Sequence, residues 1–323
     1  MAQKRDQNVL IMHGIGWGDQ GEDYAAPLKE NIRREFKKSI NALKLPDITS
    51  GDIRGPKGLR FQAVYWSPIT QDPEDELIRL LGLDKEGYGP KVYVKLRRQM
   101  IGLLGDMIAY EGEGHKVYKA IHSRIDDYME QLLIGLKPEG EFDTPAPLTL
   151  IGHSLGSVIA SDYMWDNMKK GIPRYHLANG KLALKNMFLL GSPLALYALR
   201  DNPSADRETL AASLGSPLQL DPHGGTWLNL YDPQDPIGFP LKPIQSYKDA
   251  GIVDYEVRAG RFVSSLTPAS HLGYWRSRQV AHIVGHKLAL DWAAINSPAF
   301  ADRYLDEVQL FRLRLENREP IRP

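Results

Sequence analysis

LTLIGHSLGSVIASDYM, residues 148–164, passes from an apolar, strand-like segment into a helix-like pattern, with a serine between two glycines at the junction. Gly152, Ser154 and Gly156 form the G-x-S-x-G pattern of a nucleophile elbow, a sharp strand-to-helix turn that exposes a serine hydroxyl. Such a turn strains the backbone at its apex, and strain of this kind clusters at functional sites. The pattern predicts Ser154 as a nucleophile. The alternative is an ordinary glycine-rich turn.

On both sides of this stretch, other apolar runs alternate with helix-like patterns. The predicted strands are 8–12, 59–66, 148–151, 186–193, one that begins at 226 and one that begins at 254. Strands that alternate with helices favour an α/β fold in which helices cover both faces of a mostly parallel central sheet.

The size and composition of the chain limit the classes of protein it can represent. Its 323 residues, 42% of them hydrophobic, can bury one large core, so we expect a single domain over 1–323. Lys and Arg together number 40, as do Asp and Glu, so no net charge favours nucleic acid as a partner. The absence of cysteine excludes disulfides, thiolate metal sites and a cysteine nucleophile.

The pattern of the first residues is not typical of a targeting segment. The basic head is followed by an apolar run that stops at His13, without a small-residue cleavage site. No apolar stretch reaches the roughly 18 residues that span a bilayer. We therefore expect a soluble, cytoplasmic protein without a transmembrane segment. Peripheral contact with a membrane and the oligomeric state both stay open.

The connection 67–147 is too long for a simple crossover between strands, which indicates an insertion. Segments 74–83 and 91–110 within it look helical and amphipathic. We assign 68–114 to an inserted helical segment, either a cap over the active site or a pair of helices packed on the sheet. Its apolar residues include Leu77, Leu80, Leu81, Met100, Leu103 and Leu104.

A serine hydroxyl needs an imidazole to take its proton and a carboxylate to orient that imidazole. In α/β hydrolases the order along the chain is Ser, acid, His. Asp232 and Asp235 both follow a predicted strand, and Asp235 is preferred because it follows a short loop; both could instead be turn formers beside proline. His271 precedes a helix-like run and is predicted as the base.

Three other histidines are predicted to have structural or supporting roles. His282 and His286 share a helix face at spacing four, but the Glu of a metal-binding H-E-x-x-H motif is missing, so both are expected to be structural. His153 lies inside the elbow and is expected to support it. No metal site and no cofactor are expected.

The tetrahedral intermediate also needs hydrogen-bond donors for its oxyanion. The backbone N–H of Leu155 follows the nucleophile, and the loop HGIG supplies the N–H of Ile15. Gly14 and Gly16 give this loop backbone freedom, and His13 is expected to fix it. A nucleotide-binding loop is the alternative, but G-x-G-x-x-G spacing and the Lys-Ser/Thr pair of a P-loop are both missing.

Five motifs in this order resemble the α/β-hydrolase superfamily, in particular its lipase- and esterase-like members. They are VLIMHGIG, LTLIGHSLGSVIASDYM, FLLGSPL, YDPQDPIG and SHLGYW, over residues 8–290. The elbow is similar to that of intracellular phospholipase A1-like proteins and of uncharacterised bacterial hydrolases. Secreted lipases more often have a glycine where this chain has Ser157. Since the chain starts almost directly at the strand before HGIG, the resemblance implies that the first strands of the fold are missing.

The resemblance implies a serine hydrolase that cleaves a carboxylic ester, most simply a lipid or other acyl ester, without a cofactor. A thioester or a small soluble ester is the alternative substrate. A catalytically silent hydrolase fold, used as a binding module, is the alternative from another class.

Overall fold

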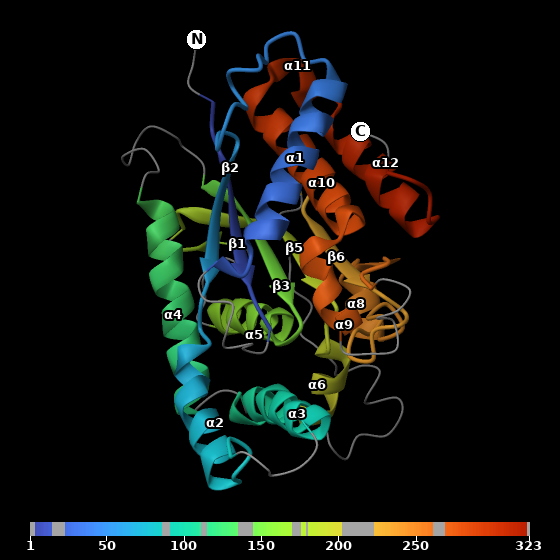
Figure 1. Ribbon diagram of the computed structural model, residues 1–323. Helices are drawn as coiled ribbons and strands as arrows, with labels where there is room; N and C mark the ends of the chain where they lie inside the picture. Colours follow the sequence, from blue (N-terminus) through green and yellow to red (C-terminus); the bar gives the residue numbers. More distant parts are fainter. Residues whose placement is uncertain are drawn as a thin grey trace.

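A central parallel sheet organises the computed structural model, which describes residues 4–14, 23–85, 91–110, 115–134, 145–169, 176–178, 180–201, 223–260 and 269–321. In these residues, six strands lie in the order β2-β1-β3-β5-β6-β7, and every neighbouring pair is parallel (Figure 1). The short β4 pairs antiparallel with β5. The strands are β1 (Gln7–Met12), β2 (Leu59–Val64), β3 (Ala146–His153), β4 (His176–Leu177), β5 (Leu182–Leu190), β6 (Thr226–Tyr231) and β7 (Val253–Glu256). The predicted α/β class with a mostly parallel sheet is confirmed.

Both faces of the sheet are buried, which explains why its strands read as nearly continuous apolar runs. In β1, all six residues are buried. Val9 and Ile11 belong to the core on one face, and Leu10 and Met12 belong to the core on the other. This alternation follows from the two-residue period of a strand.

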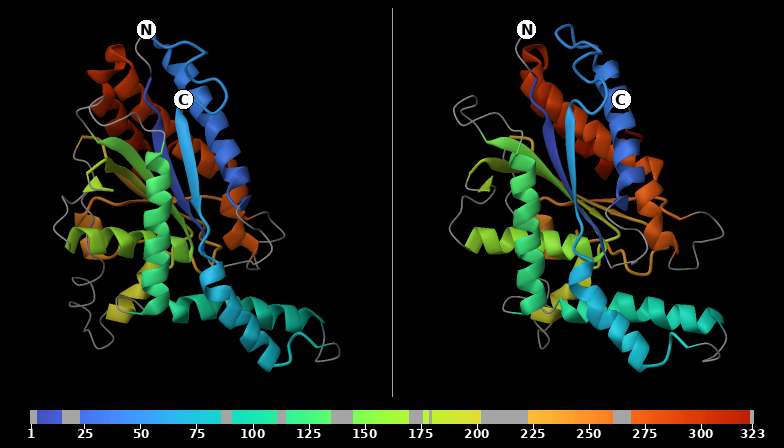
Figure 2. Two further views of the ribbon diagram at one scale, coloured as in Figure 1. Left: turned by 90° about the vertical axis from the view of Figure 1, so that its left-hand side faces the viewer. Right: turned by 60° about the vertical axis from the view of Figure 1, so that its left-hand side comes forward.

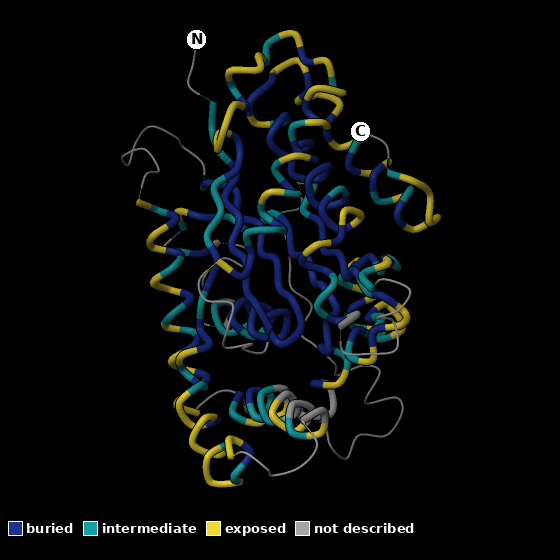
Figure 3. The backbone as a smooth tube through the Cα atoms, in the orientation of Figure 1, coloured by how far each residue is buried: buried dark blue, intermediate teal, exposed yellow. Residues whose placement is uncertain are grey.

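Helices complete one core on each face of the sheet (Figures 1 and 3). Residues of α1, α10 and α12 contribute to one core, and residues of α4, α5 and α6 contribute to the other. The helices are α1 (Ala26–Leu43), α2 (Pro68–Leu80), α3 (Lys91–Ala109), α4 (Lys116–Leu133), α5 (Leu155–Lys169), α6 (Leu194–Asp201), α8 (Gln245–Asp249), α9 (Ala269–Leu272), α10 (Arg278–Asn296), α11 (Pro298–Ala301) and α12 (Tyr304–Glu316), with a 3₁₀ turn η2 (Gly273–Arg276). None of the described helices is both long enough and apolar enough to cross a membrane.

Helices α2 and α3 occupy most of the predicted insertion and lie beyond the carboxyl ends of the strands (Figures 1 and 2). Leu80 of α2 is 68% exposed and Leu104 of α3 is 45% exposed, so neither side chain packs against the sheet. The side chains of Met100 and Leu103 lie outside the described residues. The role of 68–114 as a cap stays a prediction.

A pair of carboxyl groups lies between α2 and α3. Glu74 is 9% exposed and Asp106 is 1% exposed. Burial raises the pKa of Glu74 well above its usual range, and the charge of Asp106 and a hydrogen bond to it act in the same direction. Glu74 therefore carries a proton at neutral pH, as one member of two carboxyl groups that share a site.

This pair predicts a pH-dependent stability that Glu74→Gln should reduce. Above about pH 4.5 the unfolded chain loses a proton that folded Glu74 keeps, so the free energy of unfolding falls as pH rises, by up to about 1.4 kcal/mol per pH unit. Glutamine has no such proton. Urea unfolding at pH 5 and pH 8 should show a smaller loss of stability in the variant than in the wild type. The exposed neighbour Glu76→Gln is the control, and equal losses in Glu74→Gln and wild type would contradict a protonated Glu74.

Candidate active site

Ser154 occupies the turn between β3 and α5, at the carboxyl edge of the sheet. Its φ is +53°, in the left-handed region that is costly for a residue with a side chain. Its backbone N–H donates to the carbonyl of Leu190 at 3.0 Å, which ties the turn to the end of the neighbouring strand β5. The structure thus has the strained strand-to-helix turn that the G-x-S-x-G pattern predicts.

The two glycines of the pattern are required by close backbone contacts. A Cβ on Gly152 would lie 2.6 Å from the Cα of Ser157 in the first turn of α5. A Cβ on Gly156 would lie 2.4 Å from the carbonyl oxygen of His13. Because both neighbours are backbone atoms, neither position tolerates a side chain unless the elbow shifts. The glycines therefore allow α5 to start tightly against β3 and against the end of β1.

His13 comes directly after β1 and packs against Trp66, which follows β2. Its ring stacks on Trp66 at a centroid distance of 4.8 Å. Its Nδ1 donates to the carbonyl of Gly14 at 2.5 Å, while its Nε2 accepts from the backbone N–H of Trp66 at 3.4 Å. Burial lowers the pKa of His13 to about 4, so the ring is neutral and fits this pair of bonds. These contacts fix residues 13 and 14, the described start of the loop.

Gly14 brings this loop into direct contact with the serine. A Cβ on Gly14 would lie 2.4 Å from the Cβ of Ser154 and 3.0 Å from its Oγ. Ile15, the predicted second oxyanion donor, lies outside the described residues. The first predicted donor is the backbone N–H of Leu155. Leu155 follows Ser154 directly and is the first residue of α5.

Gly14→Ala should therefore displace the serine with little effect on the core. We expect kcat/KM for an ester to fall about 100-fold, since a displacement near 1 Å can cost that much. Gly51→Ala is the matched control, because the nearest atom to its added Cβ is 3.5 Å away. Thermal melts and initial rates of both variants test this, and a Gly14→Ala protein with the rate of the control would contradict the close contact.

The predicted acid and base lie together at the same edge of the sheet. Asp235 follows β6, and His271 lies in α9 just before α10. The Nδ1 of His271 donates to Oδ2 of Asp235 at 2.8 Å, and both side chains are buried. Burial acts to raise the pKa of Asp235, but the hydrogen bond and the charge of His271 outweigh it and lower the pKa. The ionised carboxylate fixes the proton of the imidazole on Nδ1 and leaves Nε2 as the basic nitrogen.

The basic nitrogen of His271 is available for chemistry. Its Nε2 is buried and has no hydrogen-bond partner among the described residues. In the part of the chain that the structure describes, no hydrogen bond joins Nε2 of His271 to Ser154. The segments that carry the two residues are nevertheless in contact, because His153 donates to the carbonyl of His271. Catalytic hydrogen bonds are often long in ligand-free structures and tighten when substrate binds.

Tyr274 contacts the acid as well, and sequence reasoning assigned it no role. Its hydroxyl donates to Oδ2 of Asp235 at 3.0 Å and accepts the backbone N–H of Asp232 at 2.8 Å. Burial raises the pKa of Tyr274, which keeps the hydroxyl protonated. The sequence holds one signal that could have identified Tyr274: it follows His271 by three residues, within one helical turn, in the motif SHLGYW.

Asp232 has a different set of partners. Its Oδ1 accepts the backbone N–H of Gln234 at 3.0 Å, and its Oδ2 accepts those of Ala259 and Gly260 at 2.8 and 3.2 Å. The carboxylate thus holds the loops after β6 and β7, and within the described residues its hydrogen-bond partners are backbone N–H groups, with no imidazole among them. The geometry favours Asp235 over Asp232 as the partner of His271.

His153 links the elbow to the segment that carries the base. Its Nε2 donates to the backbone carbonyl of His271 at 2.7 Å. Burial, followed by the charge of His271, lowers the pKa of His153 to about 3, so its ring is neutral. This arrangement fits the expectation that His153 supports the elbow.

His282 and His286 lie away from this constellation. His282 contacts Glu35 through Nδ1 at 3.2 Å and the carbonyl of Ile321 through Nε2 at 2.8 Å, and His286 contacts Ser39 at 3.2 Å. Among the described residues, no cluster of three or more His, Asp or Glu side chains is placed to hold a metal ion.

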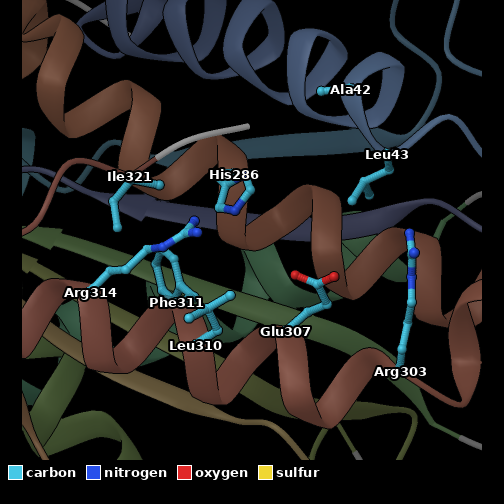
Figure 4. Close-up of a pocket in the computed structure, with 9 residues that line it drawn as sticks. All are labelled: Ala42, Leu43, His286, Arg303, Glu307, Leu310, Phe311, Arg314 and Ile321. Atoms are coloured by element: carbon cyan, nitrogen blue, oxygen red, sulfur yellow. The ribbon is translucent and has the colours of Figure 1, made fainter.

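His286 also lines a surface groove of about 400 Å³ between α1, α10 and α12 (Figure 4). The lining residues are Ala42, Leu43, His286, Arg303, Glu307, Leu310, Phe311, Arg314 and Ile321. None of the three predicted catalytic residues is among them. The candidate active site is therefore the constellation at the carboxyl ends of the strands, where open α/β sheets bind ligands.

Comparison with protein-family models, with curated proteins and with solved structures gave no match for this chain. The assignment of a function therefore depends on the geometry of the site and on the chemistry of its residues.

Proposed function

We propose that this chain is a serine hydrolase with an α/β-hydrolase fold that cleaves a carboxylic ester through an acyl-enzyme intermediate. The observation that carries this proposal is the buried hydrogen bond from His271 to Asp235 at 2.8 Å, beside a serine held at a φ of +53°. A nucleophile, a base and an orienting acid at one edge of a parallel sheet form the arrangement that activates a serine hydroxyl.

The proposed reaction uses Nε2 of His271 as the base, since Nδ1 donates its proton to Asp235. The Oγ of Ser154 attacks the ester carbonyl carbon while Nε2 of His271 takes its proton, which gives a tetrahedral intermediate and an imidazolium. The N–H groups of Leu155 and Ile15 would stabilise the oxyanion. When the intermediate collapses, the C–O bond to the alcohol breaks and His271 returns the proton to the leaving oxygen. Water then repeats the sequence on the acyl-enzyme and releases the acid.

The proposed substrate class is an ester with an apolar acyl chain, most simply a lipid. Two observations support it. Helices α2 and α3 lie beyond the strand ends, on the side of the candidate site, and they expose large apolar side chains such as Leu77 and Ile108 at 43% and 66%. Burial of an acyl chain against such a surface contributes about 0.8 kcal/mol for each methylene.

A fluorophosphonate probe tests the proposal directly, because it forms a covalent bond with an activated serine. We expect one label, located on Ser154 by peptide mass spectrometry, and hydrolysis of p-nitrophenyl esters with a rate that rises with chain length. An unlabelled wild-type protein would contradict the proposal and favour a silent binding module. Labelling with a flat chain-length profile would keep the hydrolase and remove the lipid-like substrate.

A further inference from the structure

The carbonyl group of the candidate nucleophile is held by a buried side chain that the proposed reaction does not use. The Oγ of Ser157 donates to the carbonyl oxygen of Ser154 at 2.5 Å, and the backbone N–H of Ser157 donates to the same oxygen at 2.9 Å. Ser157 is fully buried.

A second buried hydroxyl extends this contact to the end of β5. The Oγ of Ser192 lies 2.6 Å from the Oγ of Ser157 and accepts the backbone N–H of Leu194 at 3.2 Å. Each hydroxyl has one hydrogen, and that of Ser157 points to the carbonyl of Ser154. The hydrogen between the two serines therefore belongs to Ser192. The result is a chain of three bonds with one direction, from Leu194 N–H through Ser192 and Ser157 to the carbonyl of Ser154.

The series of hydrogen bonds ends at the peptide group between Ser154 and Leu155. The carbonyl of Ser154 and the N–H of Leu155 belong to one planar peptide unit, so the direction of the oxygen fixes the direction of the N–H. A hydrogen bond accepted by the oxygen also draws electron density from the nitrogen and makes the N–H a stronger donor. Bonds in a chain of one direction strengthen one another in a buried environment.

We propose that Ser157 and Ser192 are positioning residues that orient and polarise the N–H of Leu155 for the oxyanion. This inference rests on the proposed function, since it assigns these hydroxyls to the oxyanion site of the same reaction. It gives a physical reason for the serine at 157: the hydroxyl stabilises the transition state through the peptide, without contact with the substrate.

Ser157→Ala is the main test, with Ser161→Ala as the matched control. Ser161 is a buried serine one turn further along α5. We expect kcat of Ser157→Ala to fall about tenfold, less than the hundredfold or more that loss of an oxyanion donor typically costs, with KM unchanged. Ser192→Ala should cause a smaller loss, and the double variant should lose no more than Ser157→Ala because the chain is already broken. Ser157→Thr, which keeps the hydroxyl, should restore most of the rate.

A second measurement does not depend on activity. In the free protein, 13C-carbonyl serine combined with 15N-leucine selects the amide protons of the three Ser-Leu pairs, at 154–155, 213–214 and 265–266. The one signal that is absent from a Leu155→Met variant identifies Leu155. This amide proton should move upfield in Ser157→Ala and in Ser192→Ala but not in Ser161→Ala. An unchanged Leu155 resonance, or a wild-type kcat in a folded Ser157→Ala protein, would overturn the inference. If the wild type hydrolyses no ester and resists the fluorophosphonate, the proposed function fails, whereas the resonance still reports whether the hydroxyls polarise this peptide.

Discussion

Ser154→Ala should reduce kcat for ester hydrolysis by about 10⁶-fold, the loss seen when a catalytic serine is removed from a triad. The substitution removes one oxygen atom, and alanine has about the same backbone cost as serine at a φ of +53°. Circular dichroism and the unfolding midpoint should therefore match the wild type, and labelling by the fluorophosphonate should disappear. An active variant would remove Ser154 as the nucleophile.

Asp235→Asn should be the next most damaging change, with a loss in kcat of about 10⁴-fold. An asparagine cannot hold the His271 proton on Nδ1 as a carboxylate does, so Nε2 is no longer reliably the free base. Asp232→Asn is the matched control, because the same substitution there affects only backbone N–H contacts of the neighbouring loops. We expect it to change kcat less than tenfold.

Initial rates at pH 8 and urea unfolding of the two variants separate catalysis from stability. A large loss of kcat in Asp232→Asn, together with a near wild-type Asp235→Asn, would assign the acid to Asp232 instead. Equal losses of stability in both, with rates that follow the folded fraction, would make both carboxylates structural.

The sheet was predictable because its strands differ sharply from their surroundings. The six predicted strands all occur in the structure, since a strand buried on both faces reads as a short apolar run bounded by turn residues. The order of the strands was not predictable, because such a run carries no information about its neighbours. The two-residue β4 is too short to give any pattern.

Helix α4 shows a signal that sequence reasoning passed over. Its buried residues Tyr118, Ile121, Ile125, Met129 and Leu132 recur at the spacing of one helical face. The prediction placed helices only at 74–83 and 91–110 of the connection 67–147, although this spacing also predicts a helix at α4.

The candidate site was predictable to the extent that its geometry forces local patterns in the sequence. A strained serine needs small neighbours on both sides, which gives the elbow its glycines. The supporting residues give no such pattern. Tyr274, Ser157 and Ser192 make hydrogen bonds to partners that are distant in the sequence or on the backbone, and an isolated tyrosine or serine looks the same in any role.

The close contact between Gly156 and the end of β1 joins parts of the sequence that lie far apart. The carbonyls of Met12 and His13, the elbow after β3, the end of β5 and the loop of Asp235 meet at one edge, although they come from separate parts of the sequence. Local folding of any one segment brings none of these groups together. The site is therefore complete only when the long-range strand pairings have formed, and contacts of this high sequence separation are the ones that slow folding.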